Sequence, residues 1–219
     1  MEVLSWALAF ACTFSVGSSV EAREARLRVV GPSELRVEWG QVQPLPGGAF
    51  ALRSAGTRAV IGDQPRAEIE LTFTYRGPTR DVAPLASGEL RRQIGLKLRA
   101  RDTCNVVYVM WHIAPTSGIH VSVKSNPSMS EHAGCRDHGY LNLRPRGEHT
   151  VAAIARGERH VLLARIEGTQ LRVKADGAIA WEGELPPDAF AFDGPAGIRS
   201  DNGEFDVQLR ITASQSERR

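Results

Sequence analysis

Several features that would identify a common protein class are missing from this sequence. Its 219 residues contain 6% aromatic side chains, no apolar run of the length that a membrane-spanning helix needs, and no long stretch with a helical hydrophobic period. We find no phosphate-binding loop, no dinucleotide-binding fingerprint and no Gly-x-Ser-x-Gly turn. The sequence therefore gives no support for a nucleotide-dependent enzyme, a serine hydrolase of the usual kind or a helical membrane protein.

An excess of charge of either sign is also missing. The chain holds 27 Lys and Arg against 25 Asp and Glu, a net charge of +2 with neutral histidines, and both signs are spread along its length. This balance argues against a nucleic-acid partner, which requires a concentrated basic surface. Only three of the basic residues are lysines: Lys97, Lys124 and Lys174. Because arginine codons are rich in GC and lysine codons in AT, this bias indicates a bacterial genome of high GC content.

The N-terminus has the pattern of an export signal. An apolar run over residues 3–16 is followed by small residues and by Val20-Glu21-Ala22, an acceptable cleavage site. We predict a signal peptide over residues 1–22 and a mature protein that is secreted or periplasmic. Glu2 stands where a positive charge is usual, which leaves open whether Met1 is the true start. Cleavage would remove two acidic residues and no basic one, so the net charge would go from +2 to +4.

From about residue 27 the chain consists of short alternating runs separated by turn-forming residues. In residues 68–75, apolar side chains at every second position alternate with Glu and Thr. Similar runs follow, and Gly, Pro, Asp and Asn lie between them. Many short alternating strands with evenly spaced turns indicate an all-β sandwich or barrel. We predict one domain over residues 23–213 and a flexible tail over residues 214–219.

The C-terminal half carries a series of motifs that resembles a known family. One strand contains Leu171 and Val173, a hairpin turn follows at Asp176-Gly177, and residues 194–202 read Gly-Pro-Ala-Gly-Ile-Arg-Ser-Asp-Asn. Upstream, GLKLRARD and NVVYVMW form a similar central pair of strands. Over roughly residues 65–212 the chain resembles secreted concanavalin A-like lectin/glucanase domains, and most of all the bacterial 3-keto-disaccharide hydrolase-like domains. The resemblance implies an antiparallel jelly-roll sandwich, a fold that hosts lectins, linkers and hydrolases alike.

The two cysteines that remain after cleavage, Cys104 and Cys135, are expected to form a disulfide. An even number of cysteines in an exported chain favours a bridge, and this one would close a loop of about 30 residues. The alternative is a zinc site of His132, Cys135 and His138, with a further ligand from His112, His120 or Asp137. We favour the disulfide because the spacing matches no standard metal motif. His132 and His138 would then be surface residues of a loop.

One polar face of the predicted sheet is rich in large side chains, and the resemblance implies that sugars lie on this face. Aromatic rings would stack on them and polar side chains would form hydrogen bonds. The candidate groove takes strand 68–75 into the same sheet as the strands of residues 92–124. It consists of Glu70, Arg99, Tyr108, His112, His120 and Lys124. The alternatives are that residues 125–148 cover this face, or that it is an ordinary solvated sheet face.

Glycoside hydrolysis has weaker support in the sequence. It needs two carboxylates that flank the scissile bond, and Glu68 and Glu70 would lie about 7 Å apart on one strand face. Laminarinase-type members of the fold carry a third carboxylate on that strand, but Phe73 stands at the matching position here. A 3-keto-glycoside hydrolase would instead need a base and a cation or metal, for which His112, His120 and Glu70 are the candidates.

Two further features have ordinary structural interpretations. Oxygen ligands at Asp201, Asn202 and Glu204 would suit Ca²⁺. However, Asp-Asn-Gly is also typical of a tight turn, so we expect the turn and no cofactor. The three tryptophans with apolar neighbours are predicted to lie in the core: Trp39, Trp111 and Trp181.

The leading hypothesis is an exported, non-catalytic glycan-binding module. The alternatives are a glycoside or 3-keto-glycoside hydrolase that uses the same groove, and a structural or adhesive domain without a small ligand. The sequence leaves the sugar and the oligomeric state open.

Overall fold

Two antiparallel sheets make up the part of the chain that the structure describes. This computed structural model describes residues 27–212, so the predicted signal peptide and tail lie outside the described residues. The first sheet, called sheet A, has the strand order β13-β12-β11-β6-β15-β4-β3, and β1 pairs with β15. Its strands are β1 (Leu27–Val30), β3 (Gln43–Pro44), β4 (Phe50–Leu52), β6 (Glu68–Pro78), β11 (Arg159–Glu167), β12 (Gln170–Ala175), β13 (Ala178–Glu184) and β15 (Gly203–Thr212).

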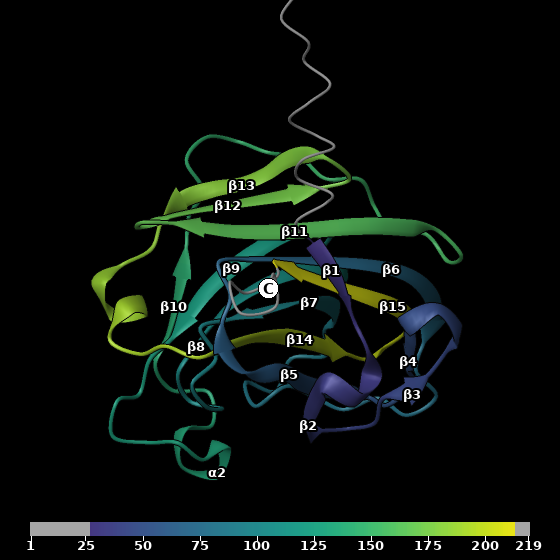
Figure 1. The fold of residues 1–219 in the computed structure, drawn as a ribbon, viewed down its shortest axis with the longest axis horizontal. Coiled ribbons are helices and arrows are strands. Elements are labelled where there is room, and N and C mark those ends of the chain that lie inside the picture. Colours follow the sequence, from purple (N-terminus) through teal and green to yellow (C-terminus); the bar gives the residue numbers. More distant parts are fainter. Residues whose placement is uncertain (1–26, 213–219) are drawn as a thin grey trace, which may run out of the picture.

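The second sheet, called sheet B, has the order β10-β9-β8-β7-β14-β5-β2. Its strands are β2 (Leu35–Trp39), β5 (Gly56–Pro65), β7 (Arg92–Leu98), β8 (Val106–Ala114), β9 (Gly118–Lys124), β10 (Tyr140–Leu143) and β14 (Pro195–Asp201). Within residues 27–212, helical structure is limited to the single turn α2 (His132–Cys135) and to three short 3-10 turns, Pro32–Glu34, Pro46–Gly48 and Pro187–Phe190. Figure 1 shows β11, β12 and β13 at the top of the molecule and α2 at the bottom, apart from the sheets. The predicted antiparallel jelly-roll sandwich is confirmed.

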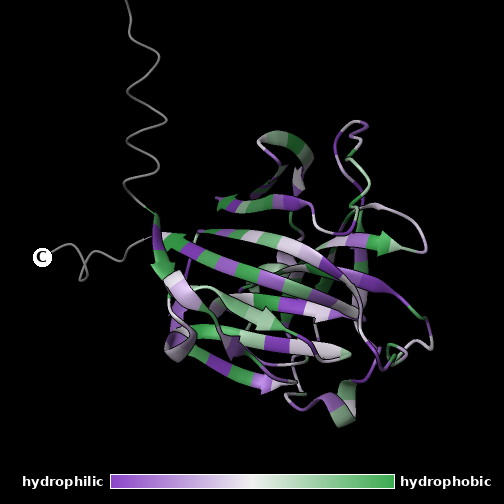
Figure 2. Ribbon diagram, turned by 90° about the vertical axis from the view of Figure 1, so that its right-hand side faces the viewer, coloured by the Kyte–Doolittle hydropathy of each residue, from purple (hydrophilic) through white to green (hydrophobic). Residues whose placement is uncertain are grey.

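The hydrophobic core lies between the two sheets. On β6 the side chains of Ile69, Leu71 and Phe73 are fully buried, which follows from the period of two in a strand. Phe73 meets Trp111 of sheet B edge to face, with ring centroids 5.7 Å apart. Burying a side chain of this size contributes on the order of 2–3 kcal/mol to folding. Figure 2 shows the alternation of hydrophilic and hydrophobic residues along the strands that this packing requires.

The prediction that strand 68–75 shares a sheet with residues 92–124 is wrong. The observed strand β6 pairs with β11 and β15 in sheet A, whereas β7, β8 and β9 are neighbours in sheet B. A segment of thirteen residues, 79–91, connects β6 to β7. A connection of this length lets the chain pass from one sheet to the other, while the tighter turns after β7 and β8 form hairpins within sheet B.

The tryptophans divide between the core and the surface. Trp111 and Trp181 are buried at 0% and 1% exposure, as predicted. The prediction for Trp39 is wrong, because its side chain is 51% exposed. Trp39 is the last residue of β2, the edge strand of sheet B, and the Arg58 guanidinium lies over its ring at 4.8 Å. No helix within residues 27–212 is long and apolar enough to span a membrane.

Candidate functional site

A large cavity opens on the face of sheet B that is turned away from the core. Its volume is about 1060 Å³, at the upper end of the range for small-molecule sites. All seven strands of sheet B contribute side chains to its floor. Residues of the segment before β7 and residues around α2 complete the lining. The strand that the predicted groove placed in this face, β6, contributes none.

Strand alternation explains why these side chains share one face. On β8 the inward set, which packs in the core, is Val107, Val109 and Trp111. The outward set, which lines the cavity, is Tyr108, Met110 and His112. Both sets are buried, because the cavity is deep enough to shield the outward set from most of the solvent. This double burial explains why β8 reads as a run of bulky residues without a clear polar face.

Two glycines occupy the cavity face in the middle of sheet B. Gly95 on β7 pairs with Met110, and Gly197 on β14 pairs with Lys97. A Cβ atom at Gly95 would lie 2.1 Å from the carbonyl oxygen of Val109, and one at Gly197 would lie 2.1 Å from that of Ala59. Since no side chain fits at either position, both positions require glycine for the neighbouring strands to pair as they do.

Asp201 holds a buried network of charged side chains on the floor. Its carboxylate accepts hydrogen bonds from Arg199 Nε at 2.8 Å, Gln93 Nε2 at 2.7 Å and Arg58 Nη2 at 3.3 Å. Burial alone would raise the pKa of Asp201, but the Arg199 and Arg58 charges and the hydrogen bonds outweigh it and lower the pKa. Asp201 is therefore ionised at neutral pH and is a poor proton donor.

A second buried ion pair lies beside this network. The ammonium of Lys97, which is fully buried on β7, donates a hydrogen bond to the Glu38 carboxylate of β2. Burial lowers the pKa of Lys97, and the Glu38 charge opposes that shift. Buried charges require partners of this kind because desolvation is costly. The edge strand β2 is thus tied to the centre of the sheet.

His112 and His120 form a stacked pair on β8 and β9. Their ring centroids are 3.7 Å apart and the planes differ by 11°. Burial, followed by the charges of His120, Arg91 and Arg199, lowers the pKa of His112 to about 3. Burial and Arg91 also lower the pKa of His120. Both rings are neutral at pH 7 and together present a flat surface with hydrogen-bonding edges.

Aromatic rings and cations alternate at the other side of the floor. Tyr108 and Tyr140 stack with centroids 6.1 Å apart, and the Arg199 guanidinium lies 4.9 Å from the Tyr108 ring. The Lys124 ammonium lies 5.2 Å from the Tyr140 ring. Burial, and then Tyr108, raises the pKa of Tyr140 to about 12. These rings are placed to pack against an apolar ligand surface, with charged groups beside them.

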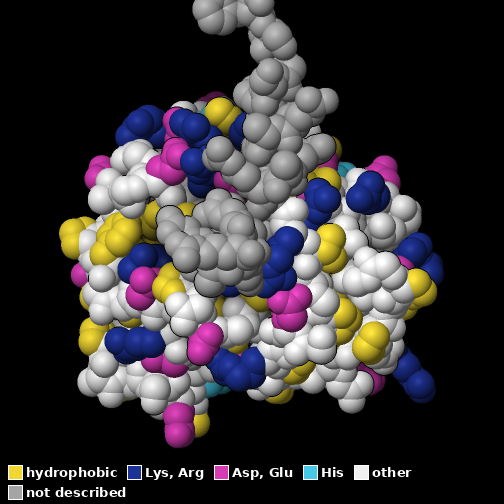
Figure 3. Space-filling model, viewed as in Figure 1, with side chains coloured by type: hydrophobic (Ala, Val, Ile, Leu, Met, Phe, Trp, Pro, Cys, Tyr) yellow, Lys and Arg dark blue, Asp and Glu magenta, His cyan; other side chains and the backbone are white. Residues whose placement is uncertain are grey.

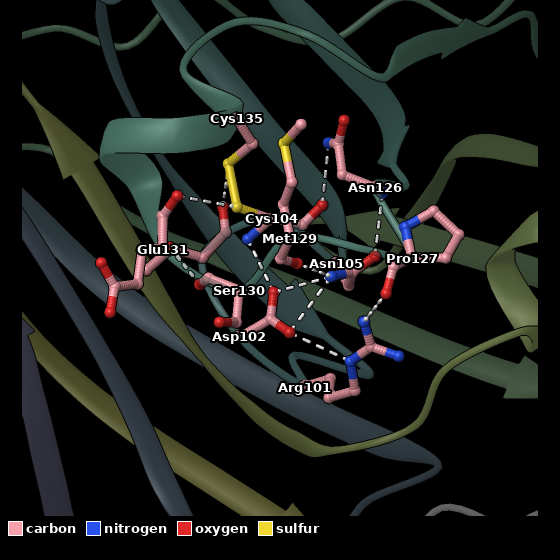
Figure 4. Close-up of polar contacts among 11 residues, drawn as sticks. Arg101, Asp102, Cys104, Asn105, Asn126, Pro127, Met129, Ser130, Glu131 and Cys135 are labelled. Atoms are coloured by element: carbon pink, nitrogen blue, oxygen red, sulfur yellow. Dashed lines mark hydrogen bonds and ion pairs between the residues drawn. A yellow bond between two sulfur atoms is a disulfide. The ribbon is translucent and has the colours of Figure 1, made fainter.

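The disulfide fixes the wall of the cavity that includes α2. Cys104, in the turn between β7 and β8, is bonded to Cys135 of α2, which confirms the predicted bridge and excludes Cys135 as a metal ligand. Figure 4 shows the polar contacts around it. The side-chain nitrogen of Asn105 donates a hydrogen bond to the carbonyl of Met129 at 2.9 Å, and the backbone N–H of Asn126 donates one to Asn105 Oδ1 at 2.9 Å. The loop from residue 125 to 139 therefore does not cover the sheet but stands at its side, and His132 contributes to the lining.

Asn202 fixes the opposite wall. It adopts a left-handed backbone conformation, with φ of 56°, in the turn between β14 and β15. Its side-chain oxygen accepts from the Ala83 amide at 2.8 Å, and its side-chain nitrogen donates to the carbonyls of Ala83 and Arg91 at 2.9 Å each. This residue thus holds both ends of the segment 83–91 that lines the cavity.

The three residues considered for Ca²⁺ do not converge. Asp201 is bound by Arg199, Asn202 holds the segment before β7, and Glu204 lies 3.9 Å from Arg53. Across residues 27–212 no group of three or more His, Cys, Asp or Glu side chains is arranged to hold a metal ion. The geometry at Asp-Asn-Gly is that of the predicted turn.

The structure brings four of the six predicted groove residues together. Tyr108, His112, His120 and Lys124 all line the cavity. Glu70 does not, because β6 belongs to sheet A, where its carboxylate faces Arg210 at 3.7 Å. Arg99 does not either, because its guanidinium turns away to the carbonyls of Ala189 and Phe192, at 2.9 and 2.7 Å.

Several cavity residues were not identified from the sequence. They are Glu38, Trp39, Arg58, Arg199 and Asp201. Strands β2, β5 and β14 are distant in the sequence from β8 and β9, so the spacing of residues gave no sign that they share a face. The one available signal was the Arg199-Ser200-Asp201-Asn202 motif, in which every second side chain, Arg199 and Asp201, points into the cavity.

Comparison with known proteins gives a fold but no family. No family model and no curated protein matches the sequence. Among solved structures, the carbohydrate binding module CBM66 from Bacillus subtilis matches 83% of this chain and 96% of its own, with a TM-score of 0.58 and 11% identity. SCLam, a non-specific endo-β-1,3(4)-glucanase from family GH16, matches 87% of this chain and 92% of its own, with a TM-score of 0.51 and 11% identity. At this level of identity the similarity establishes the sandwich fold alone.

Proposed function

We propose that the cavity of sheet B binds a carbohydrate and does not cleave it. The observation that carries the proposal is the composition of the floor, where stacked rings alternate with fixed hydrogen-bonding groups in a cavity of about 1060 Å³. A sugar ring has apolar C–H faces and a rim of hydroxyl groups, so it needs both kinds of contact. A cavity of this volume has room for an oligosaccharide of a few rings. The carbohydrate-binding neighbour of the same fold supports the proposal.

The carboxylates of the cavity favour binding over hydrolysis. A glycosidase needs one carboxylic acid with a raised pKa to protonate the leaving oxygen. Asp201 has a lowered pKa and is held by two arginines, and Glu38 is paired with Lys97. The remaining carboxylates, Glu89 and Asp137, are exposed and come from the two separate loop segments of the lining. No pair of free carboxylates therefore lies on the floor among the described residues.

A thermal-melt screen of the unreduced protein against a panel of oligosaccharides and polysaccharides tests this function. A ligand at 100 times its Kd stabilises the folded state by about 2.7 kcal/mol, which a melting curve resolves. Binding at the cavity predicts that Tyr140→Ala removes the stabilisation, while Lys174→Gln on sheet A retains it. If no saccharide shifts the melting temperature of well-folded protein, the proposed function is wrong.

A hydrolase that acts on a 3-keto-glycoside is the second candidate, and the neutral His112–His120 pair is the observation that favours it. A neutral imidazole can accept a proton, and His120 is the exposed member of the pair. The very low pKa of His112 makes it a weak base. Incubating the protein with a saccharide found in the screen, followed by product analysis, separates the two functions. If the wild-type protein converts the saccharide and His120→Gln does not, the function is catalysis and not binding alone.

The disulfide also bears on where the protein works. Bridges of this kind form and persist in oxidising compartments, so Cys104–Cys135 supports a place outside the cytoplasm. We therefore keep secretion or a periplasmic location as part of the proposal. Detection of a mature N-terminus near residue 23 in an exported fraction would support it, and an intact N-terminus in the cytoplasm would contradict it.

A further inference from the structure

We infer that the cavity accepts a saccharide with a negatively charged substituent, a carboxylate or a sulfate, an inference that rests on the proposed function of the cavity as a glycan site.

Cations outnumber anions among the side chains of the floor. The floor carries four cationic groups, Arg58, Lys97, Lys124 and Arg199, against the two anionic groups Glu38 and Asp201. The loop segments add two of each sign: Arg91 and Arg136 against Glu89 and Asp137. The lining therefore has an excess of two positive charges, as large as the net charge of +2 of the whole chain.

Each of the two anionic groups of the floor already contacts two cations. Asp201 is bound by both Arg199, at 2.8 Å, and Arg58, at 3.3 Å. Glu38 is bound by Lys97 and also lies 3.5 Å from Arg36 outside the cavity. One negative charge thus faces two positive charges at each carboxylate, so a net positive charge remains at both places.

Lys124 is a buried cation without a carboxylate partner. Its ammonium donates to the carbonyl oxygens of Arg136 at 2.7 Å and Thr103 at 3.3 Å, and it lies 3.1 Å from Cys135 Sγ. No carboxylate of the described residues lies within ion-pair distance of it. Burial, and then the charges of Arg199 and Arg58, lowers the pKa of Lys124 to about 8, so the group is still mostly protonated at pH 7. Dipoles hold this charge in place, and the carboxylates of Asp137 and Asp102 act on it only from beyond ion-pair distance, so its field is compensated in part.

This concentration of one sign differs from the outer surface. On the face that Figure 3 displays, basic and acidic side chains are interspersed. Charges on such a surface are screened within about 8 Å at physiological salt, whereas charges in a shielded cavity are screened much less. An anionic substituent in the cavity would meet a net positive field, and guanidinium groups bind carboxylate and sulfate oxygens in pairs of hydrogen bonds.

The neutral rings allow the sugar itself to share the cavity with its charged substituent. His112 and His120 carry no charge at neutral pH and form a flat surface. The charged groups lie to one side of the rings, since β14, which carries Arg199, is separated by β7 alone from β8, which carries His112. We place the ring of the saccharide against the histidines and its acidic group toward Arg199 and Arg58.

Calorimetric titration with matched saccharides tests the inference. The ligands are uronate oligosaccharides with their neutral methyl esters, and sulfated oligosaccharides with their desulfated forms. We expect the charged member of a pair to bind about tenfold more tightly, and this preference to weaken in high salt. Arg58→Gln removes one partly buried floor cation, which lies 3.3 Å from Asp201 and over the ring of Trp39, and should reduce the preference about three- to tenfold. Arg172→Gln, which removes an arginine paired with Glu182 on sheet A, should leave it unchanged.

The outcomes separate this inference from the proposed function. Binding of neutral and charged members with equal affinity, or of neutral members alone, overturns the anionic ligand and leaves the glycan site in place. Binding of no member by folded protein overturns both. A preference that Arg58→Gln and Arg172→Gln reduce equally places the effect outside the cavity and overturns the assignment. The pair that shows the larger ratio identifies the substituent as carboxylate or sulfate.

Discussion

The stacked pair His112–His120 should make the fold sensitive to mild acid. In the unfolded chain a histidine takes up a proton near pH 6.5, whereas the pKa of His112 in the folded protein is about 3. Between these values only the unfolded chain is protonated at this residue, so lowering the pH favours unfolding. The contribution of His112 to stability is complete above pH 6.5 and is lost progressively as the pH falls toward 3.

The size of this effect follows from the two pKa values. One pKa unit corresponds to about 1.4 kcal/mol, and pH 4.5 lies two units below the unfolded value of 6.5. His112 alone should therefore lower the free energy of unfolding by on the order of 2–3 kcal/mol between pH 7 and pH 4.5. Its low exposure of 6% means that solvent screens little of this cost.

Urea unfolding at pH 7 and pH 4.5 measures this loss directly. His112→Gln, which cannot titrate, should lose on the order of 2–3 kcal/mol less than the wild-type protein between the two pH values. His149→Gln removes an exposed histidine outside the cavity and serves as the control. An unchanged pH dependence in His112→Gln, with the same m value, would refute the assignment of a strongly lowered pKa to His112.

Three further predictions concern the walls and the core. Replacing Cys104 and Cys135 together by Ser should lower the free energy of unfolding by about 3–4 kcal/mol for a loop of sequence separation 31, as measured in denaturant, and no loss would contradict the entropic account. Trp111→Ala should cost about 3–5 kcal/mol because the side chain is fully buried, while Trp39→Ala, 51% exposed, should cost less than about 1 kcal/mol; equal costs would contradict the placement. Asn202→Ala removes three hydrogen bonds to the cavity wall and should cost about 2–3 kcal/mol, with faster proteolysis between residues 83 and 91 as the local sign; proteolysis at the wild-type rate would show that the wall does not depend on Asn202.

The sandwich fold could be predicted from the sequence because the patterns that indicate it, strand alternation and turn motifs, are local. The alternation at Ile69, Leu71 and Phe73 depends only on the two-residue period of a strand, and turn residues such as Asp176 and Asn202 adopt the left-handed conformation that their motifs indicate. The disulfide could be predicted because two cysteines remained after the proposed cleavage. These inferences required no knowledge of which strands are neighbours.

The site was only partly accessible, because a cavity depends on strand order. Tyr108, His112, His120 and Lys124 lie on β8 and β9, which form a hairpin, so their common face follows from the sequence. Arg199 and Asp201 reach the same floor through the pairing of β14 with β7, about a hundred residues away. The prediction for Glu70 fails because it takes β6 and β7, which follow one another in the chain, to lie in the same sheet. Consecutive strands need not pair, and these two belong to different sheets.

The two glycines at the centre of sheet B limit how the site can change during evolution. On the floor a substitution exchanges one side chain for another and so alters which ligand is preferred. At Gly95 and Gly197 even a methyl group would collide with the carbonyl of the adjacent strand at 2.1 Å. Single mutations at these positions therefore disturb the pairing of β7 or β14, which brings the floor residues together. The selectivity of the site can drift through its side chains, while the pairing beneath them depends on both glycines.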